Sequence, residues 1–399
     1  MTELVILVGG KGTRLGKFTK KIPKPLLKID KNKTFLDFLL SKLVKYNFKK
    51  IYLLCSFKKD LFFKKYHLKK IHNSKLICVD EGKPKDTGGA LYPLRKIIKN
   101  NFVLVNGDTY FDFNYNLFKN IIPKNIIGSI AITDNFQYKK NIKINNIFLN
   151  KFGFLNISKS ETNLMNAGIY FFKKKIFKYV QNKKLSLEND ILPNLIRNNK
   201  IKGIYSNNKF IDIGYIKNLL HVRKKTNILK QKCVFLDRDG VINKVKKNSY
   251  IKKFVEFKFL PGVIKSIKIL NEKDYLVIII TNQAGVGKSI MSEKQLNLIH
   301  QKMMKIINLK NGGIINDIYY SPYYKNSKYL RYRQNCKNRK PNIGMFKMAI
   351  DKWNIDINNS FFIGDSVSDM LAAKKLNLKF YYKEKISLDK QIIKIVNNE

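Results

Sequence analysis

The stretch from Val234 to Asn243, V-F-L-D-R-D-G-V-I-N, constrains the fold of this chain more than any other. Its apolar start predicts a short buried strand, and Gly240 allows the chain to turn away afterwards. Asp237 and Asp239 are two residues apart, so in an extended chain their side chains point to the same side. Open α/β sheets bind ligands at the carboxyl ends of their strands. The stretch therefore predicts a pair of carboxylates suited to nucleophilic and acid–base chemistry, although D-x-D is also common in polar turns.

The length and composition indicate a protein of more than one domain. The chain has 399 residues and 44% of them are hydrophobic, enough for two or three packed cores. No apolar run approaches the ~20 residues that a membrane span requires, so no membrane partner is expected. The N-terminus has an acidic residue and a short apolar run, which predicts a strand and not a signal peptide. Its four cysteines lie far apart without a C-x-x-C pair, which favours free thiols and a cytoplasmic location.

The formal net charge of +51 raises the possibility of a nucleic-acid-binding protein. Only eight of the 79 basic residues are arginine, and the lysines are spread over the whole chain. Abundant Asn, Ile, Phe and Tyr share A/T-rich codons with Lys, so a compositional bias is the simpler cause. A dedicated binder more often clusters arginine, which grips phosphate with two hydrogen bonds. We expect no specific nucleic-acid partner, while the positive field helps to collect phosphorylated substrates.

The first motif follows an apolar strand predicted from Leu4 to Val8. Residues 9–16 read G-G-K-G-T-R-L-G, and such glycines let backbone N–H groups approach an anion while Arg14 adds a fixed charge. The loop is neither a dinucleotide fingerprint nor a Walker A loop, because Leu15 stands where the fingerprint needs its third glycine. Downstream, prolines on both sides hold Lys24 in a rigid extended segment.

These motifs and four later ones resemble the sugar-1-phosphate nucleotidyltransferase family over residues 1 to about 222. The later motifs are D-T-G-G-A at 86–90, a strand ending in Asp108, N-A-G at 166–168, and F-I-D-I-G at 210–214. The resemblance implies that Asp108 and Asp212 hold Mg²⁺, and that Arg14 and Lys24 balance the charge of the phosphates. The substrate-binding residues that it implies are Gly9, Gly10, Gly12, Thr13, Gly88, Gly89, Lys159, Asn166 and Gly168.

One position departs from this family. A Glu-Lys pair usually precedes N-x-G, and its glutamate contacts sugar hydroxyls, but the aligned residues here are Ser158 and Lys159. Residues 186–188, S-L-E, look most like the heptose-1-phosphate guanylyltransferases, which implies GTP as the nucleotide. The sequence leaves open the nucleotide base, the sugar and its anomer.

The second half carries three further polar strand ends after the 234–243 stretch. A buried strand is predicted at 276–280 and runs into Thr281 and Asn282; Asn282 stands where a Walker A loop needs glycine. R-K-P at 339–341 follows, and then a strand ending in Asp365 with Asp369 four residues later. Neither segment between these motifs is long enough for a large cap domain.

Together these motifs resemble the haloacid dehalogenase superfamily over residues 232 to about 385. In detail the motifs resemble those of one branch, the D-glycero-D-manno-heptose-1,7-bisphosphate 7-phosphatases, with histidinol phosphatases as close kin. The resemblance implies that Asp237 is the nucleophile, that Asp239 is the general acid and base, and that Thr281 and Lys340 hold the phosphoryl group. Mg²⁺ is expected on Asp237, the backbone carbonyl of Asp239 and Asp365. Asn282 and Arg339 would orient the substrate, and the role of Asp369 stays open.

A zinc loop of these relatives is degenerate in this chain. The C-x-H and C-x-C positions read Ser321-Pro322-Tyr323 and Cys336-Lys337-Asn338, which leaves one of four ligands. No zinc is therefore expected, because one cysteine cannot hold a structural zinc ion. Packing of Tyr319, Tyr320, Tyr323 and Tyr324 is expected to hold the loop instead.

The sequence as a whole predicts an α/β protein of two doubly wound domains. Residues 1–227 form a Rossmann-like nucleotidyltransferase domain, and residues 228–399 form a haloacid-dehalogenase-like phosphatase domain without a large cap. The expected activities are hydrolysis of the 7-phosphate of a heptose 1,7-bisphosphate and nucleotidyl transfer to the heptose 1-phosphate, for lipopolysaccharide or surface polysaccharide biosynthesis. Alternatives are a hexose-1-phosphate transferase joined to a histidinol-phosphatase-like domain, or a basic nucleic-acid-binding protein with decayed sites. The oligomeric state and any channelling stay open.

Overall fold

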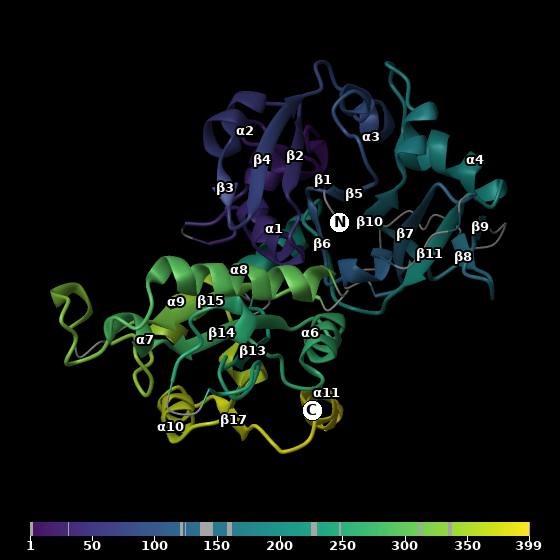
Figure 1. The fold of residues 1–399 in the computed structure, drawn as a ribbon. Coiled ribbons are helices and arrows are strands. Elements are labelled where there is room, and N and C mark those ends of the chain that lie inside the picture. The colour runs from purple at the N-terminus through teal and green to yellow at the C-terminus, as the bar shows by residue number, and fades with distance from the viewer. Residues whose placement is uncertain are drawn as a thin grey trace. The chain divides into compact units, whose positions relative to one another are not determined.

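The computed structural model of the chain divides into two compact units, residues 1–228 and 229–399 (Figure 1). The structure describes residues 3–30, 32–119, 123, 125–135, 147–157, 162–224, 230–246, 249–309, 313–333 and 337–398. The expected domain boundary after residue 227 falls within 225–229, outside the described residues. Each unit is an α/β fold around its own sheet, so the predicted fold class is confirmed.

The first unit is built on an eight-stranded sheet with the order β11-β7-β10-β5-β1-β2-β4-β3. Its strands are β1 (Glu3–Leu7), β2 (Lys50–Cys55), β3 (Lys70–Ile71), β4 (Ser74–Asp80), β5 (Phe102–Asn106), β7 (Gly128–Thr133), β10 (Met165–Phe172) and β11 (Ile201–Tyr205). The central strands β4, β2, β1 and β5 are parallel, and β10 runs antiparallel to both β5 and β7. Two small antiparallel pairs lie outside this sheet: β6 (Thr109–Phe111) with β12 (Phe210–Asp212), and β8 (Ile147–Leu149) with β9 (Leu155–Ile157).

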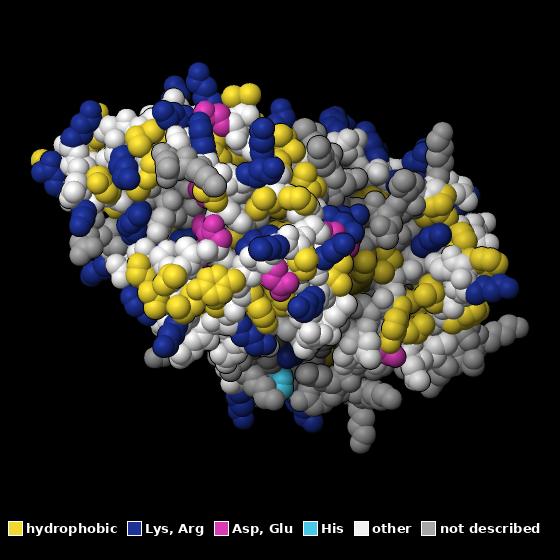
Figure 2. Space-filling view, turned by 60° about the horizontal axis from the view of Figure 1, so that its bottom comes forward, with side chains coloured by type: hydrophobic (Ala, Val, Ile, Leu, Met, Phe, Trp, Pro, Cys, Tyr) yellow, Lys and Arg dark blue, Asp and Glu magenta, His cyan; other side chains and the backbone are white. Residues whose placement is uncertain are grey.

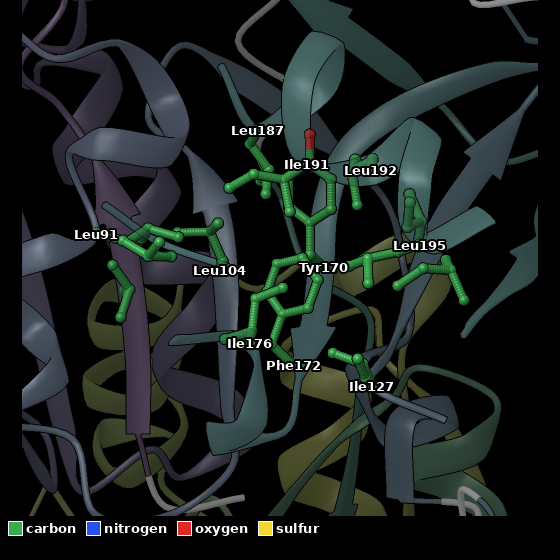
Figure 3. Close-up of a cluster of buried hydrophobic side chains, with 14 of the residues drawn as sticks. Leu91, Leu104, Ile127, Tyr170, Phe172, Ile176, Leu187, Ile191, Leu192 and Leu195 are labelled. Atoms are coloured by element: carbon green, nitrogen blue, oxygen red, sulfur yellow. The ribbon is translucent and has the colours of Figure 1, made fainter. Parts of the chain in front are cut away.

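Helices pack on this sheet through apolar faces. They are α1 (Phe35–Leu43), α2 (Lys59–Tyr66), α3 (Asp86–Gly89), α4 (Leu192–Arg197) and α5 (Ile216–Lys224). A large cluster of buried side chains joins β5 and β10 to α4 and to the turn η8 (Leu187–Ile191). Figure 3 shows Tyr170 at its centre, among Phe172, Leu187 and Ile191. This core fixes the segment around residues 185–192 against the sheet.

The second unit has a five-stranded parallel sheet with the order β15-β14-β13-β16-β17. The strands are β13 (Cys233–Leu236), β14 (Leu276–Asn282), β15 (Asp317–Ser321), β16 (Phe361–Gly364) and β17 (Lys379–Tyr382). The helices are α6 (Val263–Glu272), α7 (Ala284–Gly287), α8 (Glu293–Leu309), α9 (Gly344–Trp353), α10 (Val367–Lys375) and α11 (Leu388–Asn397). Because β13 is central, both expected aspartates emerge in the middle of the sheet edge. No separate cap domain occurs among the described residues between these strands.

Candidate functional site

The polar residues of the second unit meet around Asp237, which follows β13 directly. Its backbone N–H donates to the carbonyl of Ile363 on β16, so the residue stays part of the sheet edge. Oδ1 of Asp237 lies 2.9 Å from Nζ of Lys340, and both side chains are buried. Burial raises the pKa of Asp237 to about 6, although the Lys340 ammonium acts in the opposite direction. A buried carboxylate beside a fixed cation is a plausible attacking group for a phosphate.

Asp369 holds the ammonium group of Lys340 from the other side. Nζ of Lys340 lies 2.6 Å from Oδ1 of Asp369 and donates to the carbonyl of Ile280 at 2.9 Å. Asp369 is fully buried, and its Oδ2 accepts from Ser366 Oγ in a capping box at the start of α10. The role that the sequence left open is therefore at least structural, because Asp369 fixes the position of Lys340.

Asp239 is surrounded by hydrogen-bond donors. The guanidinium of Arg238 makes two close contacts with its carboxylate, at 2.8 and 3.0 Å, and Asn243 donates to Oδ1 at 2.8 Å. Gln283 donates to Oδ2 at 2.7 Å. Burial works toward a higher pKa, but Arg238 and these amides together hold the pKa of Asp239 below its ordinary value. In this arrangement Asp239 is ionised.

The remaining predicted residues divide between the phosphate site and its support. Thr281 is buried at the end of β14, and its Oγ1 accepts from Gln283 at 2.9 Å. Asn282 was expected to orient the substrate, but its amide makes two hydrogen bonds to the backbone of Lys340, at 3.0 and 3.2 Å. Asn282 therefore supports the segment that carries Lys340. Arg339 is half-buried and donates to the carbonyl of Tyr323 at 3.3 Å.

Carboxylate oxygens of Asp237, Asp365 and Asp369 lie within 4.8 Å of one another. Burial, and then the charge of Asp369, raise the pKa of Asp365, although the Lys340 ammonium acts in the opposite direction. Carboxylates are the oxygen ligands that Mg²⁺ favours, so the donor set fits this ion. Both oxygens of Asp369 are already engaged, Oδ1 by Lys340 and Oδ2 by the hydroxyl of Ser366. Asp237 and Asp365 are therefore the better ligands.

Gly240 leaves room for the carboxylate of Asp365 beside the other acidic side chains of the site. It has a φ of +85°, and a Cβ atom here would lie 1.7 Å from Oδ2 of Asp365. We expect Gly240→Ala to displace Asp365 and lower phosphate release about 10²-fold, as a shift of an ångström in an active site can do. A phosphate-release assay measures this. Gly153→Ala, at a positive-φ glycine with nothing within 4 Å, is the matched control and should keep full activity; equal losses in both variants would contradict the explanation.

Sequence reasoning missed several residues that support the phosphatase site. They are the buried side chains of Arg238, Asn243, Gln283 and His300. His300 lies 3.2 Å from Nη1 of Arg238, and burial lowers its pKa to about 3, so it is neutral and accepts from the guanidinium. The sequence carried one signal for Gln283: it stands two residues after Thr281 in an extended segment, so the two side chains point to the same side. Nothing in the sequence indicated His300, which comes from α8.

In the first unit, the pairing of two short strands brings together the two aspartates expected to bind metal. β12 pairs with β6 so that Asp212 lies opposite Thr109, the neighbour of Asp108. Burial, and then the charge of Asp108, raise the pKa of Asp212 to about 6. Two carboxylates at one cavity also fit Mg²⁺.

Both aspartates line a cavity of about 290 Å³ together with Gly10, Arg14 and Lys24. Nζ of Lys24 lies 3.2 Å from Oδ2 of Asp108. Arg14 is exposed and lies over the ring of Tyr215, 5.1 Å from its centre. Further lining residues, which the sequence analysis did not single out, are Thr87, Asn106 and Thr109. The cavity thus combines metal-binding oxygens with two positive charges.

The other predicted residues of the first unit surround this cavity less directly. Gly9 packs against the carboxylate of Glu81, and Gly12 has a φ of +69° with Lys24 against it. Gly88 and Gly89 donate their N–H groups to the carbonyl of Leu185, so they anchor α3 to that segment. Of the remaining expected residues, Thr13 is exposed, and Asn166 and Gly168 lie on β10. Lys159 lies outside the described residues.

The degenerate zinc loop is held by a small apolar cluster. Val286, Met291, Leu296 and Tyr332 are buried together, with Tyr250 and Tyr320 packed against them. Of the four tyrosines expected to pack, only Tyr320 belongs to this cluster, and its main aromatic residue is Tyr332. The packing of Tyr320 agrees with the expectation, and the cluster also contains Tyr332, which the sequence analysis did not name. Cys336 lies outside the described residues.

On the face of the molecule that Figure 2 shows, the positive charge is dispersed. Figure 2 shows lysines and arginines scattered among other side chains over the visible face. Within the part of the chain that the structure describes, no helix is both long and apolar enough to cross a membrane.

Comparisons with known proteins match each half of the chain separately. Residues 3–139 match the family model described as nucleotidyl transferase, and residues 232–387 match polynucleotide kinase 3 phosphatase. The chain is 38% identical over 149 residues to a D-glycero-beta-D-manno-heptose-1,7-bisphosphate 7-phosphatase of Haemophilus ducreyi, covering 37% of this chain and 80% of the relative. It is also 36% identical to a D-glycero-alpha-D-manno-heptose-1,7-bisphosphate 7-phosphatase of Campylobacter jejuni, and the match covers 36% of this chain and 77% of the relative.

A solved structure, HddC from Yersinia pseudotuberculosis complexed with GMP-PN, is 29% identical with a TM-score of 0.48 and covers 57% of this chain and 100% of its own. Its N-terminal part is a nucleotidyl transferase domain, so the chain combines a nucleotidyltransferase with a phosphatase. Through its C-terminal part the chain belongs to the family of the heptose-1,7-bisphosphate 7-phosphatases.

Proposed function

We propose that the C-terminal unit removes the 7-phosphate of a D-glycero-D-manno-heptose 1,7-bisphosphate, and that the N-terminal unit transfers a guanylyl group to the heptose 1-phosphate. The observation that carries this proposal is the Asp237–Lys340–Asp369 cluster beside Asp365, in a unit whose relatives are named as 7-phosphatases. The product of that reaction is a sugar 1-phosphate, the acceptor class expected for the N-terminal domain. The choice of GTP rests on the resemblance of residues 186–188 to guanylyltransferases.

In the phosphatase reaction, a carboxylate oxygen of Asp237 attacks phosphorus and the bond to the sugar oxygen breaks, which leaves an aspartyl-phosphate. Lys340 and Thr281 hold the phosphoryl oxygens, since Lys340 is fixed by Asp369 and Thr281 by Gln283. Asp239 gives a proton to the leaving sugar oxygen and then takes one from the attacking water, which releases phosphate and restores Asp237. Bound Mg²⁺ would neutralise charge between the anionic nucleophile and the phosphate.

The carboxylate of Asp239 is in the ionised form that the second step, hydrolysis of the aspartyl-phosphate, requires. Its contact with Arg238 keeps it ionised, which suits a group that accepts a proton from water. The first step requires the protonated form, so the contact with Arg238 must loosen when the substrate binds. The guanidinium is buried and held by His300 on its other side, which favours movement of the Asp239 side chain over movement of Arg238.

In the transferase reaction, the phosphate of the sugar attacks the α-phosphorus of the nucleotide and pyrophosphate leaves. Arg14 and Lys24 would balance the negative charge of both phosphates, and Asp108 and Asp212 would hold Mg²⁺. Asn166 would contact the sugar. This chemistry depends mainly on positioning and charge neutralisation, which the cavity between these residues provides.

A substrate screen of the whole protein tests the proposal. Heptose and hexose phosphates are offered with each nucleoside triphosphate, and phosphate and pyrophosphate are read separately. We expect phosphate release from the heptose 1,7-bisphosphate, and pyrophosphate release from heptose 1-phosphate with GTP above the other nucleotides. Turnover of hexose 1-phosphates and histidinol phosphate in preference to the heptose compounds would replace the proposed substrates.

A further inference from the structure

We infer that Glu188 is a positioning residue of the transferase site. One oxygen of its carboxylate holds Thr87 directly, and the other holds Asn166 through the hydroxyl of Tyr170. The inference rests on the proposed role of Asn166 in contacting the sugar. Glu188 lies in the turn η8, more than a hundred residues from Thr87 in sequence, and no polar residue of that turn was assigned a function. It contributes a carboxylate in a chain that lacks the usual glutamate before N-x-G.

The carboxylate accepts hydrogen bonds on both of its oxygens. Oε2 accepts from the hydroxyl of Thr87, a residue that lines the cavity with Asp108 and Asp212. Oε1 accepts from the hydroxyl of Tyr170 at 2.9 Å. Thr87 in turn accepts the N–H of Leu187 at 2.9 Å, so Glu188 and the neighbouring backbone grip the same side chain.

The direction of this hydrogen-bond chain is fixed, because an ionised carboxylate only accepts. Tyr170 is fully buried, and burial followed by the charge of Glu188 raises its pKa well above the ordinary value, so it remains a donor. Its oxygen then accepts from Nδ2 of Asn166 at 2.9 Å, while Oδ1 of Asn166 accepts from Gly168. Glu188, acting through Tyr170, and the N–H of Gly168 together set which way round the amide of Asn166 faces.

The backbone of β10 supports this reading. The register between β10 and β7 shifts between Asn166 and Tyr170, and such irregularities re-aim side chains next to active sites. Gly168 has a φ of +71°, and its missing Cβ leaves room for Asn106, which lines the cavity. Figure 3 shows the hydroxyl of Tyr170, in red, directed toward the segment that carries Leu187 and Ile191. Thr87 on α3 and Asn166 on β10 are thus connected through the carboxylate of Glu188.

Steady-state kinetics of the full chain with D-glycero-D-manno-heptose 1-phosphate and GTP test the inference. Glu188→Ala and Tyr170→Phe should each raise the KM for the sugar phosphate about tenfold, as loss of a hydrogen bond to a charged group can do. Thr87 belongs to the D-T-G-G-A motif, which resembles the segment near the nucleotide in the nucleotidyltransferase family. Tyr170→Phe leaves the contact between Thr87 and Glu188 intact, so the KM for GTP should stay unchanged. The double variant should be no worse than Glu188→Ala, since the two residues act in series. Glu188→Gln should recover most of the affinity, because its amide can still accept from Tyr170.

Two controls separate positioning from folding. Asp190→Ala removes a carboxylate from the same turn, where it accepts the N–H of Ser186 at 2.7 Å without contacting Thr87 or Tyr170. It should lower the melting temperature without changing either KM, and phosphate release should be normal in every variant. If Asn166→Ala raises the KM for the sugar phosphate but Glu188→Ala and Tyr170→Phe do not, the inference is wrong. If Asn166→Ala itself leaves that KM unchanged, the proposed sugar contact fails and the inference fails with it.

Discussion

Asp237→Asn is expected to abolish phosphate release from heptose 1,7-bisphosphate and to leave pyrophosphate release from heptose 1-phosphate intact. The amide of asparagine is not a nucleophile, and loss of a covalent catalyst lowers turnover by on the order of 10⁴-fold or more. Folding should survive the change, because Lys340 keeps its ion pair with Asp369 at 2.6 Å. Asp108→Asn should do the reverse, since Asp108 lines the other cavity together with Lys24 and Asp212.

The two activities are measured on the same preparation, so each serves as the control for the other. Thermal unfolding of both variants shows whether the protein is intact. Asp237 belongs to the second compact unit and Asp108 to the first. Loss of both activities in a folded single variant would contradict the assignment of one site to each unit.

The grouping of the candidate residues at one sheet edge could be predicted from the sequence because it follows from strand ends. Asp237, Thr281 and Asp365 each follow or end an apolar strand, and parallel strands place their carboxyl ends at one edge of the sheet. The same reasoning located Asp108 at the end of β5. These positions depend on the backbone alone, and hydrophobic patterning is enough to find them.

The residues that support these groups could not be predicted from the sequence. Arg238 folds back on its neighbour Asp239 and meets His300 from α8, and Thr87 meets Glu188 from a distant turn. Such contacts depend on side-chain rotamers and on which helix covers a given strand end, and no local pattern encodes either. The short pairing of β6 with β12, which joins Asp108 and Asp212, was equally invisible because strands of three residues carry no periodic signal.

Removal of divalent metal with a chelator is expected to stop both activities, and Mg²⁺ alone should restore them. Each site gathers carboxylate oxygens, the ligands that Mg²⁺ favours: Asp237 and Asp365 in one, Asp108 and Asp212 in the other. Loss of a metal that stabilises a phosphoryl transition state by several kcal/mol lowers turnover by on the order of 10³-fold or more. Phosphate and pyrophosphate assays before and after dialysis against the chelator measure the loss and the recovery.

Zinc should be neither present in stoichiometric amounts nor needed for that recovery. Ser321, Tyr323 and Asn338 are poor zinc ligands, and the loop is held by the packing of Tyr332 with Val286 and Leu296. Tyr332→Ala should therefore lower the stability of the second unit by about 3 kcal/mol or more, as removal of a buried aromatic ring does, and added zinc should not restore it. Elemental analysis of protein purified without a metal-binding tag checks the absence of zinc. Tightly held zinc whose removal unfolds residues 229–399 would show that ligands from elsewhere in the chain complete a metal site in this loop.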